Sequence, residues 1–145
     1  MSEFNIERFI EAQNGAISGY AQALGEIKNG RKTWHWIWYV FPQMRGLGIS
    51  SNSVFYGISC REEAEEYLSD ATLSSRLREI ATALLTHADK RVIDVLGHGD
   101  AMKVRSSMTL FDAICPGDVF GLVLERFFTG RRCGKTLSLL AQNKG

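Results

Sequence analysis

The sequence contains little proline and little cysteine. Only 2 of its 145 residues are proline, so a proline-rich spacer between domains is excluded. Its 3 cysteines lie far apart, with no C-x-x-C pair and no Cys/His cluster at zinc spacing. We therefore expect no metal site and no disulfide framework. Unpaired thiols are typical of proteins of the reducing cytoplasm, which is the location that we expect.

The sequence also lacks an excess of charge and a long apolar run. It has 17 basic and 16 acidic side chains, a net charge of +1, whereas a dedicated nucleic-acid binder usually has a basic excess. The longest apolar run, residues 36–41, is far too short to span a bilayer. Residues 1–4 do not resemble the start of a secretory signal. We therefore expect neither a membrane nor a nucleic acid as a partner, and the oligomeric state stays open.

Apolar residues make up 45% of the chain and are spread along its whole length. A chain of this size buries roughly 70% of the surface that it exposes when unfolded, enough for one core. Apolar residues recur at helical spacing, most clearly over residues 17–27, 73–85 and 119–128, and no sustained alternation of period two occurs. The pattern predicts an all-α fold: a single compact domain over residues 1–145, with seven or eight helices joined by short loops.

Residues 31–51 do not follow this pattern. All three tryptophans fall within five positions, interleaved with His35, and Pro42 ends the aromatic run. Aromatic and β-branched residues favour a strand, but a buried helical turn fits such a short run equally well. We expect a helix over residues 34–41, because the remainder of the chain is helical.

The aromatic run supplies the first group of candidate ligand-binding residues: His35, Trp36, Trp38, Gln43 and Arg45. An aromatic wall with polar groups at its rim can stack a planar ligand or a sugar. Histidine titrates near neutrality and can donate or accept a proton there. The alternative is that this segment forms the central element of the core.

The second group consists of Lys103, Arg105, Ser106 and Ser107. Two cations and two hydroxyls near the start of a helix form a reasonable anion site. The alternative is structural, with Arg105 paired to a carboxylate and the serines bonded to the helix backbone.

Other motifs are incomplete. Residues 130–136 resemble a phosphate-binding loop, but three residues instead of four separate the glycines, and a helical pattern precedes them. Ser106 or Ser107 could in principle form a triad with His98, but no G-x-S-x-G turn surrounds either serine. The dinucleotide-binding G-x-G-x-x-G and the zinc motif H-E-x-x-H are absent. We therefore expect no cofactor, and no catalytic residue can be identified.

Three segments together resemble a known family. They are HWIWYVFPQ at residues 35–43, GLGIS at 46–50 and KVRSSMTLF at 103–111, with supporting similarity at 6–13 and 124–131. They are similar to the hallmark segments of the domain-of-unknown-function 1810 family, small bacterial and fungal proteins. The resemblance covers nearly the whole chain and implies a mainly helical fold with no established activity. Trp34 departs from the family pattern, in which a small residue precedes His35.

Some members of that family carry the label calpastatin, the name of a disordered protease inhibitor, whereas the composition of this chain builds a core. The residues favour an uncharacterised protein that binds or processes a small polar or anionic metabolite, such as a nucleotide or an ADP-ribose-like compound. The ligand would lie between the His-Trp-x-Trp segment and the Arg-Ser-Ser-Met helix. The alternative is a non-catalytic protein-interaction or regulatory domain.

Overall fold

The computed structural model describes residues 4–142, which form ten helices and no strand beyond one isolated bridge. The helices are α1 (Glu7–Gln13), α2 (Tyr20–Lys28), α3 (Ile37–Val40), α4 (Ser51–Phe55), α5 (Arg61–Ser69), α6 (Ala71–Leu85), α7 (Val92–Leu96), α8 (His98–Ile114), α9 (Val119–Phe128) and α10 (Gly134–Gln142). The all-α prediction is confirmed. No helix within residues 4–142 is long and apolar enough to cross a membrane.

The structure has more helices than the seven or eight predicted, because it contains single-turn helices. The helical expectation for residues 34–41 is confirmed only for the turn α3. Helix α4 was not predicted, since its five residues are too few to show a period. It begins at Ser50, whose hydroxyl accepts a hydrogen bond from the backbone N–H of Ser53 at 3.1 Å.

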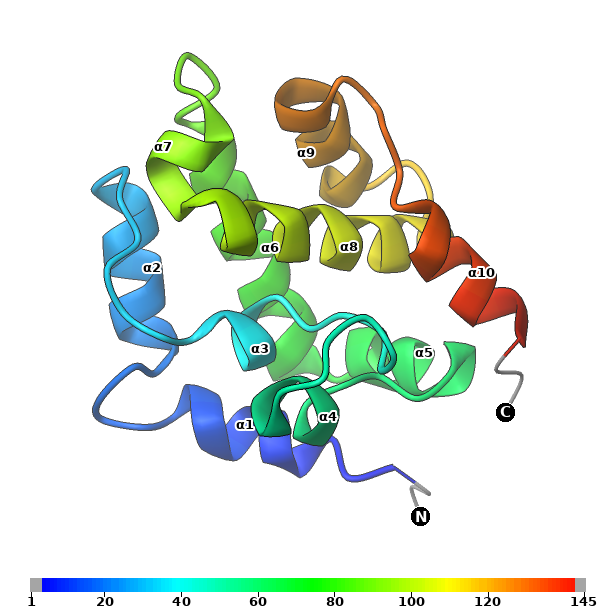
Figure 1. The fold of residues 1–145 in the computed structure, drawn as a ribbon. Coiled ribbons are helices and arrows are strands. Elements are labelled where there is room, and N and C mark those ends of the chain that lie inside the picture. Colours follow the sequence, from blue (N-terminus) through cyan, green and yellow to red (C-terminus); the bar gives the residue numbers. More distant parts are fainter. Residues whose placement is uncertain (1–3, 143–145) are drawn as a thin grey trace.

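Helix α8 crosses the middle of the molecule and packs against α3, α5, α7, α9 and α10 (Figure 1). Its apolar face consists of Val104, Met108 and Phe111, all fully buried. These residues recur at i, i+4 and i+7, so they form one stripe along the helix. Burying each such side chain contributes about 1.5–3 kcal/mol to the stability of the fold. Helix α8 is therefore a central element of the core.

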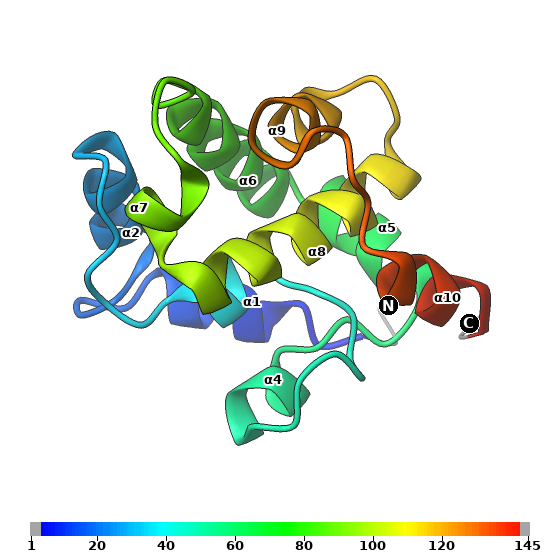
Figure 2. The ribbon, with the colours of Figure 1, turned by 45° about the horizontal axis from the view of Figure 1, so that its top comes forward.

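The segment between α3 and α5 lies on the side of the molecule away from α6 and α9 (Figure 2). A backbone bridge fixes it: the N–H of Ile58 donates to the carbonyl of Gln43 at 2.9 Å, and the N–H of Arg45 donates to the carbonyl of Ile58 at 2.8 Å. Gly57 allows this close approach, since a Cβ there would lie 2.7 Å from the Cβ of Arg45. The bridge places Gln43 and the loop after it over α8.

Candidate functional site

A hollow of about 570 Å³ lies between this segment and α8, and we call it the α3–α8 pocket. Trp38, Gln43 and the loop of residues 47–50 form one side, with Ser53 of α4. Helix α8 contributes Met102, Lys103 and Ser106. The volume falls within the range of small-molecule sites, and the lining combines apolar walls with a few polar groups.

Gln43 is the unusual polar group of the pocket. The residue is only 8% exposed, but its amide faces the pocket and is not sealed from solvent, and it makes no side-chain hydrogen bond with residues 4–142. Most amides in protein interiors bond to other protein groups, whereas this one is left to bond to water or to a ligand in the pocket. The backbone bridge to Ile58 holds Gln43 in place. The pocket therefore presents a rigidly positioned group with both donor and acceptor capacity.

Gly48 brings the loop close to this amide. A Cβ at position 48 would lie 2.5 Å from the hydroxyl oxygen of Ser53 and 3.9 Å from the amide nitrogen of Gln43. No larger residue fits there without moving α4 or the loop. Gly48 thus sets the width of the pocket above Gln43.

The three tryptophans lie in three different environments. Trp38 is half-buried and forms a wall of the pocket. Trp36 lies entirely inside the core, where its indole N–H donates to a carboxylate oxygen of Glu26 at 2.9 Å. Trp34 is half exposed to solvent. Only Trp38 can therefore contact a ligand in the pocket, and for Trp36 the core alternative describes its position.

Lys103 brings positive charge to the pocket. Its ammonium lies 3.5 Å from one oxygen of Asp100, and its side chain is 31% exposed. The other oxygen of Asp100 binds Lys32 at 2.7 Å. Two lysines thus share one carboxylate, which leaves a net positive charge around Asp100, and Lys103 is the member of this group that lines the pocket.

The two serines of α8 differ. Ser106 lines the pocket and donates to the carbonyl of Met102 at 3.1 Å, which leaves its lone pairs available as acceptors. The hydroxyl of Ser107 is fully buried, finds no partner within residues 4–142, and lies outside the pocket lining.

Arg105 lies elsewhere. Its guanidinium donates to the carbonyls of Arg131 and Arg132 at 2.7 and 2.8 Å, and so holds the loop after α9 against α8. It lines a different hollow, of about 350 Å³. His35 is exposed, and its carbonyl accepts from the hydroxyl of Tyr39 at 3.2 Å. His35 and Arg105 therefore do not share the pocket.

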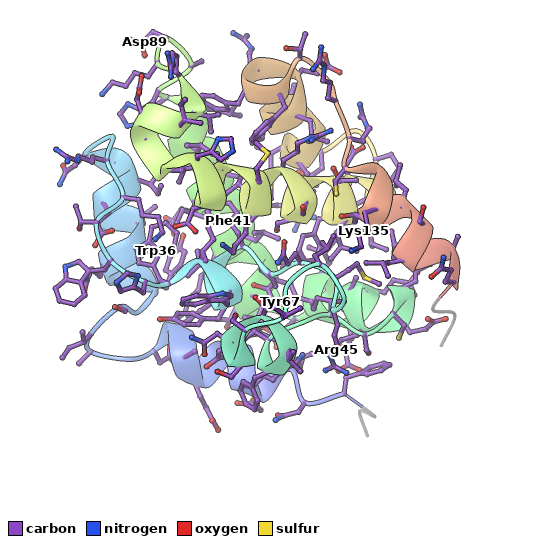
Figure 3. The ribbon with its side chains drawn as sticks, in the orientation of Figure 1. Trp36, Phe41, Arg45, Tyr67, Asp89 and Lys135 are labelled. Atoms are coloured by element: carbon purple, nitrogen blue, oxygen red, sulfur yellow. The ribbon has the colours of Figure 1, made fainter. Side chains whose placement is uncertain are left out.

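Arg45 lies in another hollow of about 510 Å³, which we call the Arg8–Glu63 hollow. Figure 3 shows Arg45 well apart from Trp36. Its guanidinium donates to the carbonyls of Val54 and Gly57 at 3.3 and 3.5 Å. The structure thus brings four of the candidates together, namely Trp38, Gln43, Lys103 and Ser106, and places the other five outside the pocket.

Sequence reasoning missed Ser53, Met102 and the loop at Gly48. Ser53 lies on α4, whose five residues show no period, so nothing in the sequence places that hydroxyl. Met102 precedes Ser106 by four residues, and a helical projection puts the two on one face. The GLGIS segment was noticed only through the family resemblance.

These features define an all-α protein with a small pocket built around one buried amide. The chain belongs to the family described as "Protein of unknown function (DUF1810)", which matches residues 3–140. A similar solved structure is the conserved hypothetical protein Rv1873 from Mycobacterium tuberculosis. It is 37% identical, the match covers 97% of this chain and 99% of that one, and the TM-score is 0.91. A search of curated proteins finds no match.

Proposed function

We propose that the α3–α8 pocket binds a small polar metabolite that carries a planar ring and an anionic group, such as a nucleotide or an ADP-ribose-like compound. The observation that carries this proposal is the buried amide of Gln43. In the free protein this amide can bond only to water in the pocket, and a ligand that supplies complementary hydrogen bonds takes the place of that water. A nucleobase edge or a carboxamide offers a donor and an acceptor side by side.

Trp38 supports a planar ligand. Its ring lines the pocket together with the amide of Gln43, so a ring that stacks on the indole meets the amide at its edge. Stacking on an aromatic side chain contributes about 1–3 kcal/mol per nucleobase.

The charge of the pocket supports an anionic group. Lys32 and Lys103 together outnumber the single carboxylate of Asp100 that contacts both of them. A phosphate beside Lys103 would restore the balance and accept charge-assisted hydrogen bonds. Ser106, three residues along the same helix, adds a hydroxyl on the same face.

The proposal is one of binding. Lys103 is the titratable group among the described residues that line the pocket, and its lining hydroxyls have no histidine or carboxylate beside them in that lining. A general acid–base mechanism needs such a pair within hydrogen-bonding reach.

The test compares Gln43→Leu with Gln142→Leu, the same change at an exposed position of α10. The purified proteins would be titrated calorimetrically with AMP, ADP, ADP-ribose, ribose 5-phosphate and inorganic phosphate. We expect wild type and the control to bind at least one of the first three, and Gln43→Leu to lose about 10–100-fold in affinity, the equivalent of one or two hydrogen bonds. Absence of binding to all five by the wild type would reject the proposal.

Binding to another protein is the second candidate, and exposed apolar side chains favour it. Ile49 is 100% exposed at the edge of the pocket, and Met102 and Phe55 are also exposed. A protein with a complementary apolar surface would cover them. If a partner is captured and purified, Ile49→Asp should weaken its binding while the affinity for nucleotides stays unchanged.

We also propose a cytoplasmic location. Its support is that Cys60, Cys115 and Cys133 are all free thiols, which persist in a reducing compartment. Fractionation of cells that express the tagged chain would test this location, and recovery outside the cytoplasm would contradict it.

A further inference from the structure

Cys133 lies immediately before α10, at the point where this helix meets α8. Its carbonyl accepts from the N–H of Leu137, four residues on, which makes it the cap residue of α10. Its own N–H donates to the hydroxyl of Thr109 on α8 at 2.9 Å. Both backbone polar groups of Cys133 are therefore hydrogen-bonded, while its side chain remains partly exposed. Figure 3 shows Lys135, two residues later, beside α8.

Hydrogen-bond donors surround the sulfur of Cys133. Partial burial raises the pKa of this thiol, but the polar side chains of Ser106 and Thr136 near the sulfur and the N–H groups of Thr136 and Lys135 at the start of α10 outweigh that effect. The net result is a pKa below the usual value of a cysteine thiol. Donors stabilise the thiolate more than the thiol, because the negative charge accepts stronger hydrogen bonds.

The hydroxyl of Thr136 gives an independent indication of what this site accepts. Thr136 is fully buried, and its hydroxyl has no hydrogen-bond partner within residues 4–142. A buried hydroxyl in that state has lost its hydrogen bonds to water without replacement. Thr136 is the third residue of the helix that Cys133 caps, the position that a cap side chain faces, so a negatively charged sulfur, or an oxygen atom attached to it, is the acceptor that would satisfy it.

The surrounding charges are largely engaged by the chain itself. Arg132 pairs with Asp112 at 3.0 Å and lies 3.9 Å from Glu125, and Arg105 of α8 holds the carbonyls of the loop. Lys135 of α10 is exposed. Segment 130–136 resembles a phosphate-binding loop in sequence. In the structure, the side chain at the start of the helix that follows is the thiol of Cys133.

We propose that Cys133 is a redox modification site, at which a hydroperoxide oxidises the thiolate to a sulfenic acid. The sulfur attacks the terminal oxygen of the peroxide, the S–O bond forms and the O–O bond breaks. The sulfur loses two electrons to the peroxide, whose other oxygen leaves as hydroxide or alkoxide and takes up a proton from water. The new oxygen accepts from the hydroxyl of Thr136. This inference does not depend on the proposed ligand of the α3–α8 pocket.

The first test measures thiol reactivity in the intact chain. The rate of alkylation by iodoacetamide would be followed at each cysteine by mass spectrometry between pH 5 and pH 9, with the partly exposed Cys115 as the internal control. We expect Cys133 to react faster than Cys115 below pH 7, by about tenfold for each unit that separates their midpoints. Equal rates would overturn the proposal without any variant.

The second test measures the oxidation itself. The chain would be treated with hydrogen peroxide and dimedone, and we expect the sulfenic acid adduct at Cys133 ahead of Cys60 and Cys115. Thr136→Val, which removes the hydroxyl but keeps the shape, should slow this reaction several-fold, and Thr136→Ser should restore it. Ser106→Ala gives a second variant if Thr136→Val does not fold. An adduct at Cys133 no faster than at Cys115, or a rate that neither folded variant lowers, would overturn the proposal.

Discussion

The α3–α8 pocket and the Arg8–Glu63 hollow are similar in volume, about 570 and 510 Å³, but they differ in the state of their polar groups. In the second hollow, Arg8 pairs with Glu63 at 2.8 Å and donates to the carbonyls of Phe55 and Gly57. In the first, the amide of Gln43 has no such partner within residues 4–142. Volume alone therefore does not distinguish a ligand site from a structural hollow, whereas an unused hydrogen-bonding group does.

The difference follows from what each hollow does for the fold. Arg8 connects α1 to the end of α4, to Gly57 after it and to α5, so its charged group is fully engaged in contacts that hold the fold together. Gln43 is held by its backbone alone, through the bridge to Ile58, and its side chain contributes nothing to that attachment. The amide of Gln43 is therefore available to form hydrogen bonds with a ligand.

The largest expected effect comes from breaking the Arg8–Glu63 pair. Glu63→Ala leaves the buried guanidinium of Arg8 without its counter-charge, and we expect a loss of about 3–5 kcal/mol in the free energy of unfolding, measured by urea denaturation. Glu65→Ala is the control, because Glu65 pairs with Arg61 at the surface and should cost less than about 1 kcal/mol. Equal effects of the two changes would remove the contrast between a structural ion pair and a surface one.

The next effect compares two buried glutamines. Gln13 donates to the carbonyl of Tyr39 and to the hydroxyl of Tyr67 at 2.7 and 3.2 Å, whereas the amide of Gln43 is unpaired within residues 4–142. Gln13→Leu should cost about 1–3 kcal/mol of unfolding free energy, and Gln43→Leu should cost about nothing or stabilise the fold. Urea denaturation of both variants checks this. A large destabilisation by Gln43→Leu would show that its amide serves the fold after all.

The capped helices could be predicted from the sequence. Asp118 stands directly before the apolar pattern of residues 119–128, which is a sequence signal for a helix start, and its carboxylate accepts from the N–H of Val119 at 2.6 Å. Ser59 and Glu62 have the S-x-x-E spacing of a capping box, but in the structure the backbone N–H and the hydroxyl of Ser59 donate to Glu63, one residue further along. A shift of one residue changes the capping partner but leaves the apolar pattern unaltered, so the pattern cannot reveal it.

The site could be predicted only in part, and helix geometry explains which part. Lys103 and Ser106 are three residues apart and share a face of α8, whereas Arg105 lies about 200° away from Lys103. Trp36 lies just before α3 with a non-helical backbone, and it is buried in the core while Trp38 lines the pocket. The pairing of Gln43 with α8, in contrast, depends on the bridge to Ile58, a contact between distant residues that no local pattern encodes.

A smaller effect is expected from the charge of the pocket. Lys103→Gln keeps a polar side chain but removes the positive charge, and it should lower the affinity for a phosphorylated ligand by about five- to tenfold, roughly 1 kcal/mol. The affinity for the corresponding unphosphorylated nucleoside should stay unchanged. Calorimetry at low and at high salt measures both, and the difference should shrink at high salt. An equal loss of affinity for both ligands would show that Lys103 affects the shape of the pocket and does not bind the phosphate.

The smallest expected effect concerns Glu26, a group that the fold uses fully, like Arg8. Partial burial raises the pKa of this carboxyl, but donors from Thr33, Gln22, Trp36 and Trp34 outweigh it and lower the pKa to about 2. Because the folded pKa lies below the unfolded one, the carboxylate stabilises the fold above about pH 4.5, and this contribution disappears as the pH falls toward 2.

Glu26→Gln should therefore reduce the unfolding free energy at pH 7 by about 1 kcal/mol, a value lowered by the solvent exposure of the carboxylate, and flatten its dependence on pH between 2 and 4.5. Urea denaturation at several pH values measures this slope, and Asp89→Asn, at an exposed position, is the control. A slope that Glu26→Gln leaves intact would mean that other carboxylates produce the acid sensitivity. It would also show that the hydrogen bonds of Glu26 to the residues before α3 stabilise the fold less than the contacts of Arg8 do.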